Sequence, residues 1–384
     1  MKVFVVAGEP SGDRLGAALM AGLRGLAPDL TFEGVGGPMM TGQGLTSLFP
    51  MDDLSVMGIA EVLPKYLHLR ARMIQTADAV LAARPDALIT IDSPDFCLRV
   101  AARVRAARRI RTVQYVAPSV WAWRPGRAAR MARHIDQVLA LLPFEPPLMQ
   151  AAGMRCDFVG HPVVAEPVAD AGAKAAFRAA RGLGDAPVLL VLPGSRGNEV
   201  RRLLPVFGAV VARLCARHPG LRIVLPAAPA VAETVIAGVT GWVGRPVVVD
   251  VRGLDADAAQ ATKAAAFGAA DVALAASGTV SLELAAAGTP MVVAYDMAWL
   301  SWQIMSRLAL IDTVTLVNLV TDTRVVPEFL GPACQPGPIT EALSALMAAP
   351  QTQSAALKLT MERLGRGGEA PGLRAARAVL DGLA

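Results

Sequence analysis

Short apolar runs recur along this chain, and several of them are followed within two residues by a glycine, serine or aspartate ahead of a helix-like stretch. A run that is apolar at nearly every position is typical of a strand covered on both faces, as in a parallel sheet. Strand-like and helix-like stretches alternate through both halves of the chain, which predicts two α/β domains, each a Rossmann-like doubly wound parallel sheet. The predicted strands are residues 2–7, 87–91, 112–116, 137–142, 188–192, 221–225, 247–251, 272–275 and 291–294.

The alternation weakens between residues 160 and 184, where we expect the connection between the domains. A chain of 384 residues suits two cores of ordinary size better than one. We predict a first domain over residues 1–165 and a second over 166–345, facing each other across a cleft. Helices over 346–384 follow, and packing back on the first domain is one option for them. In such sheets ligands bind at the carboxyl ends of the strands.

Composition argues against several classes of protein, among them membrane-spanning, secreted and disulfide-linked proteins. Hydrophobic residues make up 54% of the chain and the mean hydropathy is +0.45, yet no apolar run reaches the roughly 18 residues of a membrane-spanning helix. The N-terminal apolar run is too short for a signal peptide, so we expect a cytoplasmic location. The four cysteines are dispersed, and we expect no disulfide, metal site or cofactor.

The charge balance points to the kind of ligand. The net charge of +5 suits phosphorylated substrates or an anionic membrane face. Aromatic residues are 5% of the chain and do not interleave with basic ones, which argues against nucleic acid as a partner.

Two loops in the second half have the composition of anion-binding sites. Each follows a predicted strand and opens a helix, whose N-terminal amides favour an anion. The guanidinium of Arg196 can bind phosphate bidentately, and we expect Glu199 to orient it. Glu283, one turn into the second helix, lies within reach of a ribose. Together these features predict a nucleoside diphosphate site. Its candidate phosphate contacts are Gly194, Ser195, Arg196, Ser277, Gly278 and Thr279.

Asp92 is the candidate general base. It follows the predicted strand 87–91, and a carboxylate at a strand end beside a cleft can accept the proton that an attacking hydroxyl loses. A turn-capping role for Asp92 is the alternative. For Asp95 we favour a cap of the following helix.

Two further loops of the first half are candidates for the acceptor side of the cleft. In the loop at residues 8–13, Ser11 or Asp13 either caps the next helix or lies at the cleft, where the acidic side chains favour hydroxyl or amide contacts. The loop at 118–124 carries two of the five tryptophans, which face opposite ways on an extended loop. One is therefore expected to meet a sugar or acyl chain. The candidates are Glu9, Ser11, Asp13, Ser119, Trp121, Trp123 and Arg124.

Two stretches mix apolar and basic residues in a way that suits lipid contact, residues 56–74 and 299–311. Amphipathic helices with basic flanks lie in membrane interfaces, although most bury their apolar face within a domain. Asp255 and Asp257 match a DxD motif, which we interpret as a helix cap and not as a metal site.

In order and spacing, these motifs resemble the lipid-A-disaccharide synthase family almost from end to end. The resemblance rests on residues 7–13, 56–58, 92–96, 118–124, 142–145, 160–161, 192–196 and 276–279. It implies a GT-B glycosyltransferase that moves 2,3-diacylglucosamine, with inversion, from UDP-2,3-diacylglucosamine to the 6-hydroxyl of 2,3-diacylglucosamine 1-phosphate (lipid X). The products are UDP and the β-1,6-linked disaccharide of lipid A, in lipopolysaccharide biosynthesis.

The resemblance also implies positions and roles. It places the enzyme peripherally on the cytoplasmic leaflet of the Gram-negative inner membrane, and it is compatible with a homodimer. It implies that Asp92 is needed for turnover and that Arg196 contacts the donor phosphate. Ser277, Thr279 and Glu283 stand where related GT-B enzymes hold the diphosphate and ribose.

Three positions depart from the family pattern. Cys97, Val317 and Gly331 stand where the family usually has asparagine, proline and glutamine, and they receive no role here. Asn318, beside the second of them, is a further cleft candidate. Two other functions remain: a UDP-sugar epimerase, which shares the architecture and needs no acceptor, and a non-catalytic nucleotide- or lipid-binding protein.

Overall fold

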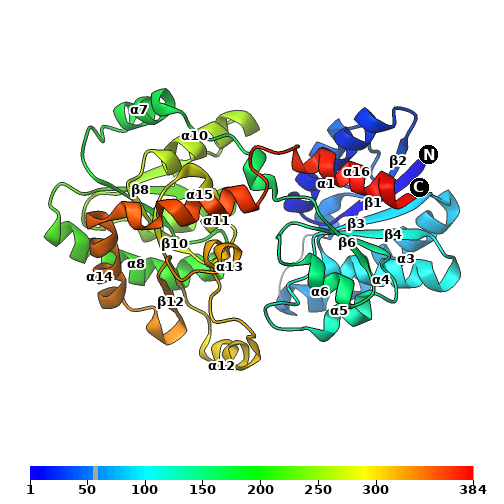
Figure 1. The fold of residues 1–384 in the computed structure, drawn as a ribbon. Helices are drawn as coiled ribbons and strands as arrows, with labels where there is room; N and C mark the ends of the chain where they lie inside the picture. The colour runs from blue at the N-terminus through cyan, green and yellow to red at the C-terminus, as the bar shows by residue number, and fades with distance from the viewer. Residues whose placement is uncertain (55–58, 384) are drawn as a thin grey trace. The chain divides into compact units, whose positions relative to one another are not determined.

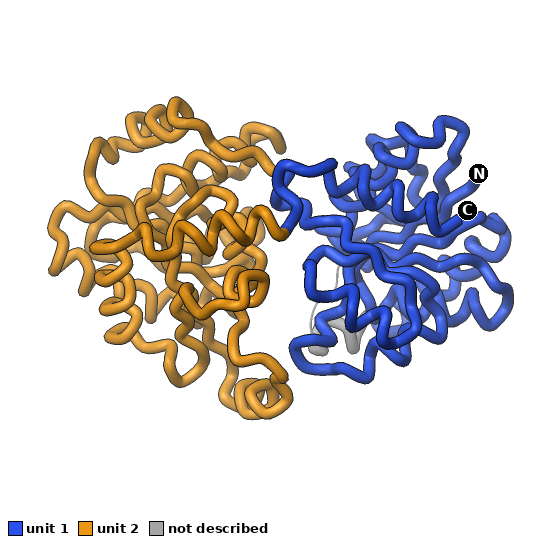
Figure 2. The backbone as a smooth tube through the Cα atoms, viewed as in Figure 1, with its two compact units in different colours: residues 1–165, 364–384 blue, residues 166–363 orange. Residues whose placement is uncertain are grey.

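The chain forms two compact α/β units, shown in separate colours in Figure 2. The computed structural model describes residues 1–54 and 59–383, and the side chains of 59–65 are not described. Unit 1 comprises residues 1–165 and 364–384, and unit 2 comprises 166–363. Each has a six-stranded parallel sheet flanked by helices, so the predicted fold class is confirmed. The terminal stretch 346–384 is divided between the two units.

The sheet of unit 1 has the strand order β2-β1-β3-β4-β5-β6. The order reverses between β1 and β3, because the chain first runs out to β2 and then returns past β1. The two edge strands, β2 and β6, carry charged and partly exposed residues and were not predicted. The strands are β1 (Lys2–Ala7), β2 (Thr31–Val35), β3 (Ala87–Ile91), β4 (Arg111–Tyr115), β5 (Gln137–Ala140) and β6 (Arg155–Phe158).

Helices cover both faces of this sheet (Figure 1). On one face α1 (Pro10–Leu26) lies beside α16 (Pro371–Leu383), and both contribute to the same apolar core. Their close approach requires glycine, since a Cβ on Gly372 would lie 2.7 Å from the carbonyl oxygen of Ala18. The opposite face is covered by α3 (Ile59–Ala83) and α4 (Pro94–Ala107). Shorter helices complete the unit: α2 (Pro38–Gly42), α5 (Gly126–Met131) and α6 (Pro146–Ala151).

The sheet of unit 2 has the order β12-β11-β10-β7-β8-β9, and here the order reverses between β7 and β10. All nine strands predicted from the sequence are present in the two sheets, with ends within two residues of those expected. The short edge strand β12 was not predicted. The strands are β7 (Val188–Leu192), β8 (Arg222–Ala227), β9 (Val247–Asp250), β10 (Val272–Ala276), β11 (Met291–Tyr295) and β12 (Glu328–Leu330).

The core of unit 2 lies between its sheet and two long helices, α8 and α14, which contribute most of the buried apolar side chains on that face. Across the described part of the chain, we find no helix with the length and apolar character needed to cross a membrane. The helices are α7 (Ala171–Ala180), α8 (Gly197–Arg217), α9 (Ala232–Gly238), α10 (Ala256–Gly268), α11 (Val280–Ala287), α12 (Trp299–Leu308), α13 (Leu316–Thr321), α14 (Pro336–Ala348) and α15 (Ser354–Arg363).

Candidate active site

The loops that follow β1 and β3 meet at the carboxyl edge of unit 1. The two strands are neighbours, and Ala7 lies opposite Ile91 in their register. This is the point where the strand order reverses, which is the usual ligand position in open α/β sheets. The Ser11 hydroxyl donates a hydrogen bond to Asp92 Oδ2, with 3.4 Å between the oxygens. Ser11 is exposed and Asp92 half-buried, so a ligand can reach the pair.

The backbone around Asp92 is strained. Asp92 and Ser93 have φ values of +51° and +39°, and Val116 at the end of the neighbouring strand has +77°. Left-handed backbone is uncommon for residues other than glycine and is an outlier for a β-branched residue such as valine. The Asp92 N–H is held at 3.0 Å from the Tyr115 carbonyl. Such strain persists only where surrounding contacts fix it, and it concentrates at functional sites.

Asp13 serves the structure of unit 1. It is buried, and its carboxylate accepts hydrogen bonds of 2.8, 2.9 and 3.0 Å from the N–H groups of Gly37, Met39 and Met40, at the start of α2. Of the two alternatives for Ser11 and Asp13, capping of the first helix does not occur. That helix begins at Pro10 after an extended Glu9, with no side-chain cap, and proline at the first position has no N–H to satisfy.

Asp95 does not cap α4 as predicted. Ser93 occupies the N-cap position in a left-handed conformation, and no side chain accepts a hydrogen bond there. Asp95 lies exposed in the first turn and pairs with Arg127 at 2.9 Å. Its charge still favours the helix N-terminus through the macrodipole.

The tryptophan loop is anchored within unit 1. The ring of Trp121 meets that of Phe144 edge to face, with 5.3 Å between centroids, and its indole N–H donates to Glu145 Oε1 at 3.3 Å. The guanidinium carbon of Arg124 lies over the Trp123 ring, 3.8 Å from its centroid, which is a cation–π contact. Trp121 and Trp123 are half-buried. Ser119 and Arg124 are exposed on the same loop.

Glu145, beneath this loop, is a buried carboxyl group without a basic partner among the contacts described. Burial raises its pKa to about 7, and hydrogen bonds from the Leu142 N–H and the Trp121 indole oppose that rise. The residue belongs to the motif at 142–145, to which sequence reasoning had assigned no function.

The two predicted anion loops lie side by side at the carboxyl edge of unit 2. They follow β7 and β10, which are adjacent, with Leu192 opposite Ala275 in the register. Again the strand order reverses at this point, so both loops occupy the usual ligand position. Gly194 and Gly278 have φ values of +110° and +153°, which glycine adopts without strain. Ser277 is half-buried and Thr279 exposed.

The first loop differs in one respect from its prediction. Glu199 does not orient Arg196; its Oε2 accepts a hydrogen bond from the Ser195 N–H at 3.1 Å, and its side chain fills the space above Gly194. Arg196 is exposed at the N-cap of α8, and we find no ion pair between it and a carboxylate of the described residues. An unpaired guanidinium at a helix N-terminus is suited to bind an anion.

Glu283 lies in the first turn of α11 and forms an ion pair with Lys263 of α10. Its side chain is partly exposed. A pocket between these helices is lined by Glu166, Gln260, Lys263, Phe267 and Glu283. The Glu283 carboxylate thus lies at the wall of this pocket and is already paired with Lys263.

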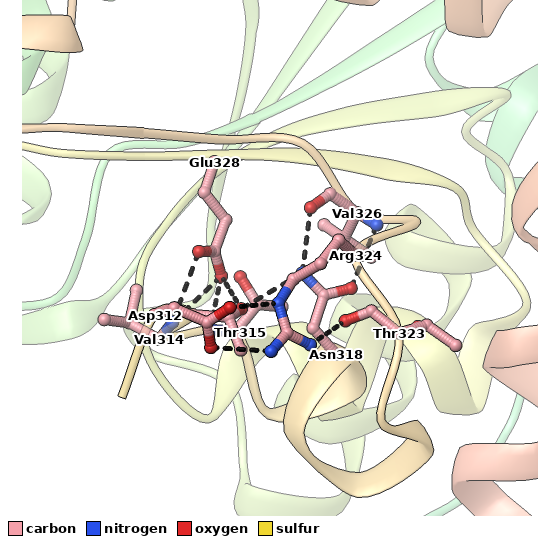
Figure 3. Close-up of polar contacts among 9 residues, drawn as sticks. Asp312, Val314, Thr315, Asn318, Thr323, Arg324, Val326 and Glu328 are labelled. Atoms are coloured by element: carbon pink, nitrogen blue, oxygen red, sulfur yellow. Dashed lines mark hydrogen bonds and ion pairs between the residues drawn. The ribbon is translucent and has the colours of Figure 1, made fainter. Parts of the chain in front are cut away.

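Asn318 is a structural residue and not a cleft residue. It is buried, and its amide nitrogen donates to the Val326 carbonyl at 2.9 Å while its oxygen accepts from the Val326 N–H at 3.0 Å. Its amide nitrogen also donates to the Thr313 hydroxyl at 3.2 Å, and that hydroxyl donates to Glu328. Figure 3 shows the surrounding network, in which Glu328 also accepts hydrogen bonds from the N–H groups of Val314 and Thr315. The prediction for Asn318 is wrong because this network uses all of its polar atoms.

The DxD motif behaves as predicted at its first residue. Asp255 Oδ1 accepts a hydrogen bond from the Ala258 N–H at 2.7 Å and caps α10. Asp257 lies in the first turn of that helix. We find no cluster of three potential metal ligands in the described residues.

Of the two stretches considered for lipid contact, the structure describes one only in part and the other in full. Residues 55–58, including Met57, and the side chains of 59–65 lie outside the description, so residues 56–74 are visible only in part. Leu67 is exposed there. In the other stretch, α12 has no fully buried residue, and its exposed apolar side chains are Trp299, Leu300, Ile304 and Leu308.

The three departures from the family pattern are all structural in this chain. Cys97 is fully buried beneath the Asp92 loop, where burial and the Asp92 charge raise its thiol pKa. Val317 is buried in α13. Gly331 has a φ of +53°, a conformation that favours glycine.

Comparison with known proteins identifies the relatives of this chain. Residues 3–370 match the family model described as lipid-A-disaccharide synthetase. The lipid-A-disaccharide synthase of Ruegeria pomeroyi is 65% identical over 383 residues, covering 100% of this chain and 96% of the relative. The chain belongs to the lipid-A-disaccharide synthase family. It is accordingly an enzyme of the glycosyltransferase class.

More distant relatives agree with this assignment. The lipid-A-disaccharide synthase of Rhodospirillum centenum is 49% identical, over 99% of this chain and 94% of the relative. Among solved structures, UDP-GlcNAc 2-epimerase from Neisseria meningitidis bound to UDP-GlcNAc has a TM-score of 0.65 at 13% identity, over 100% and 99% of the two chains. MurG of Acinetobacter baumannii has a TM-score of 0.57 at 14% identity, over 100% and 98%. Likeness at this identity shows the two-domain fold alone.

Proposed function

We propose that unit 1 supplies the general base Asp92, and unit 2 the binding site for UDP, in formation of the lipid A disaccharide. The reaction itself follows from membership of the synthase family. The substrates that the family implies are UDP-2,3-diacylglucosamine and 2,3-diacylglucosamine 1-phosphate. The observation that carries the assignment of the base is the Asp92 carboxylate, accessible at the strand-order reversal of unit 1 and attached to strained backbone.

The chemistry needs one proton acceptor. The 6-hydroxyl oxygen of the acceptor forms a bond to C1 of the donor sugar, and the bond from C1 to the UDP oxygen breaks with inversion. The hydroxyl proton passes to the Asp92 carboxylate, and UDP leaves with the electron pair. A positioned base contributes about 10²- to 10⁴-fold to such a step. Ser11, within 3.4 Å of the carboxylate, orients it.

The donor side needs positive potential for the leaving diphosphate. Arg196 and the N-termini of α8 and α11 supply it without a metal ion in this proposal. The Ser195 N–H already donates a hydrogen bond to the Glu199 carboxylate, so a phosphate oxygen would displace that carboxylate or bind beside it. The ribose hydroxyls would share the Glu283 carboxylate with Lys263.

The decisive experiment compares Asp92→Asn with Asp95→Asn. Asp95 is a matched control, since it is an exposed carboxylate three residues away that pairs with Arg127. We expect Asp92→Asn to lose at least a hundredfold in kcat, measured by mass spectrometry of the disaccharide, and to keep its affinity for UDP. The Asp95 variant should stay within threefold of wild type. Equal activity of the Asp92 variant would refute the base assignment. Turnover of the donor alone would indicate an epimerase.

Membrane association of unit 2 through α12 is the second part of the proposal. Trp299 and Leu300 are 73% and 64% exposed, and Leu310 just beyond the helix is 60% exposed. Between Asp296 and Asp312 the only charged residue is Arg307. Exposed tryptophan and leucine beside a single cation suit the interface of an anionic bilayer, where diacylated substrates reside.

Co-sedimentation with vesicles of phosphatidylethanolamine and phosphatidylglycerol tests this part. The triple variant Trp299→Ser, Leu300→Ser, Ile304→Ser should lose most vesicle binding. The pair Val243→Ser, Leu254→Ser removes similarly exposed apolar side chains elsewhere in unit 2 and should bind as wild type does. Equal binding by both variants would exclude α12 as the membrane contact.

A further inference from the structure

Two buried polar side chains face each other inside the sheet of unit 1. Thr90 of β3 and Gln114 of β4 are direct partners in the strand register, and both are essentially inaccessible to solvent. The Thr90 hydroxyl donates to Gln114 Oε1 at 2.7 Å. This hydrogen bond fixes the orientation of the amide, so that its NH₂ group points toward the carboxyl end of the strands.

The Gln114 amide nitrogen donates hydrogen bonds to the strained backbone at the ends of β3 and β4. Nε2 donates to the carbonyl oxygens of Tyr115 at 3.1 Å and Asp92 at 3.3 Å, and it lies 3.5 Å from that of Val116. Asp92 and Val116 are two of the residues with positive φ. An apolar residue at position 114 would remove this donor from both carbonyl groups. The glutamine side chain thus holds two adjacent strand ends in conformations that their own residue types disfavour.

We propose that Gln114, oriented by Thr90, is a positioning residue that holds Asp92 in its left-handed conformation and so aims its carboxylate. The neighbouring buried positions on these strands are apolar at Leu88, Ile89 and Val113 and polar at Thr112, so an apolar pair could also pack here. Burying an amide destabilises a protein unless its N–H groups and its oxygen all have hydrogen-bond partners. The partners of the Gln114 amide all lie near the carboxyl ends of β3 and β4, beside Asp92. The inference about turnover rests on the proposed role of Asp92.

The test uses Gln114→Met, which removes the amide and keeps the length of the side chain. Gln137→Met is the matched control, since Gln137 is also a fully buried glutamine of the same sheet. It lies at the amino end of β5, where it binds Asp157 and the Ala378 carbonyl. If Gln114→Met folds poorly, Thr90→Val is the milder variant, since it removes only the hydroxyl that orients the amide.

We expect Gln114→Met to lower kcat about tenfold to a hundredfold, with KM for the donor and Kd for UDP within twofold of wild type. Gln137→Met should lower thermal stability but leave kcat of the folded enzyme within twofold. The ¹³Cα and ¹³Cβ chemical shifts of Asp92, which report φ and ψ, should move toward ordinary extended values in Gln114→Met only.

Two results would overturn the proposal: equal kcat in the Gln114 and Gln137 variants, or an unchanged Asp92 chemical shift in Gln114→Met. Asp92→Asn, assayed in parallel, separates the two proposals. If that variant retains activity, the base assignment fails, whereas the chemical shift still tests whether Gln114 holds the backbone.

Discussion

The indole of Trp302 occupies the space that a side chain on Gly331 would need. An ideal Cβ at Gly331 would lie 2.5 Å from the ring, and the φ of this glycine is +53°. Trp302 belongs to α12, and Gly331 directly follows β12. The contact therefore attaches the exposed helix α12 to the edge of the unit 2 sheet.

Gly331→Ala should destabilise the protein by about 1–3 kcal/mol, because the added methyl group meets the ring and the backbone disfavours a side chain. The free energy of unfolding from denaturant titration measures this cost. In a Trp302→Ala background the clash is absent, so Gly331→Ala should cost less there. Equal costs in the two backgrounds would show that the ring does not limit this position.

Ser11→Ala should lower kcat about threefold to tenfold, since one hydrogen bond contributes about 1 kcal/mol. KM for both substrates should stay unchanged, because the hydroxyl is expected to orient the Asp92 carboxylate and not a substrate. Steady-state kinetics with product detection measures both constants. Ser11→Thr keeps the hydroxyl and should restore most of kcat; failure to restore it would indicate a steric role for the residue.

Arg196→Ala should weaken UDP binding about tenfold to a hundredfold, as expected for a charge-assisted hydrogen bond of about 1.5–3 kcal/mol. Calorimetric titration with UDP gives the affinity. Arg201→Ala is the control, since Arg201 is an exposed arginine of the same helix that binds Asn198. Arg196→Lys should restore only part of the affinity, because lysine lacks the bidentate fork. Equal losses in the two alanine variants would assign the effect to general charge.

Glu145→Gln should stabilise the protein at pH 8 and have little effect at pH 4.5. Burial raises the Glu145 pKa from 4.5 to about 7, so the native state holds a proton that the unfolded chain has released. Stability is therefore lost as pH rises through this window, by up to about 3 kcal/mol above pH 7. Denaturant unfolding of wild type and variant from pH 4.5 to 8 measures the difference.

The difference between the two proteins is the quantity to compare, because His161 acts in the opposite direction. Burial lowers the His161 pKa to about 4, so its contribution is lost as pH falls from 6.5 toward 4. That contribution is common to both proteins and cancels. A stability difference that does not vary with pH would contradict the buried, protonated state of Glu145.

Most of the strands that the sequence predicted are covered on both faces, where burial forces a continuous apolar run. The exception is the edge strand β9, which is only half-buried but begins with three valines. The edge strands β2, β6 and β12 face solvent in part and carry charged residues, so the run is broken. The loops that carry Asp92 and Arg196 were predictable for the same reason, since each directly follows such a run.

The roles of single polar residues were less predictable. Asp13 binds amides 24 to 27 residues away, and Asn318 is enclosed by a network that forms only in the folded unit. Neither partner set leaves a local pattern. Thr90 and Gln114 do leave a signal, since they are uncharged polar residues near the carboxyl ends of two neighbouring buried strands.

The return of α16 to unit 1 has a consequence for folding during synthesis. Ala375, Ala376 and Val379 complete the apolar core beside α1, yet they are translated only after the whole of unit 2. During synthesis unit 2 can therefore form its core first, while the apolar face of α1 stays exposed until α16 has been made. The segment made earliest is finished last, and chaperone binding to nascent chains is expected to concentrate on that face.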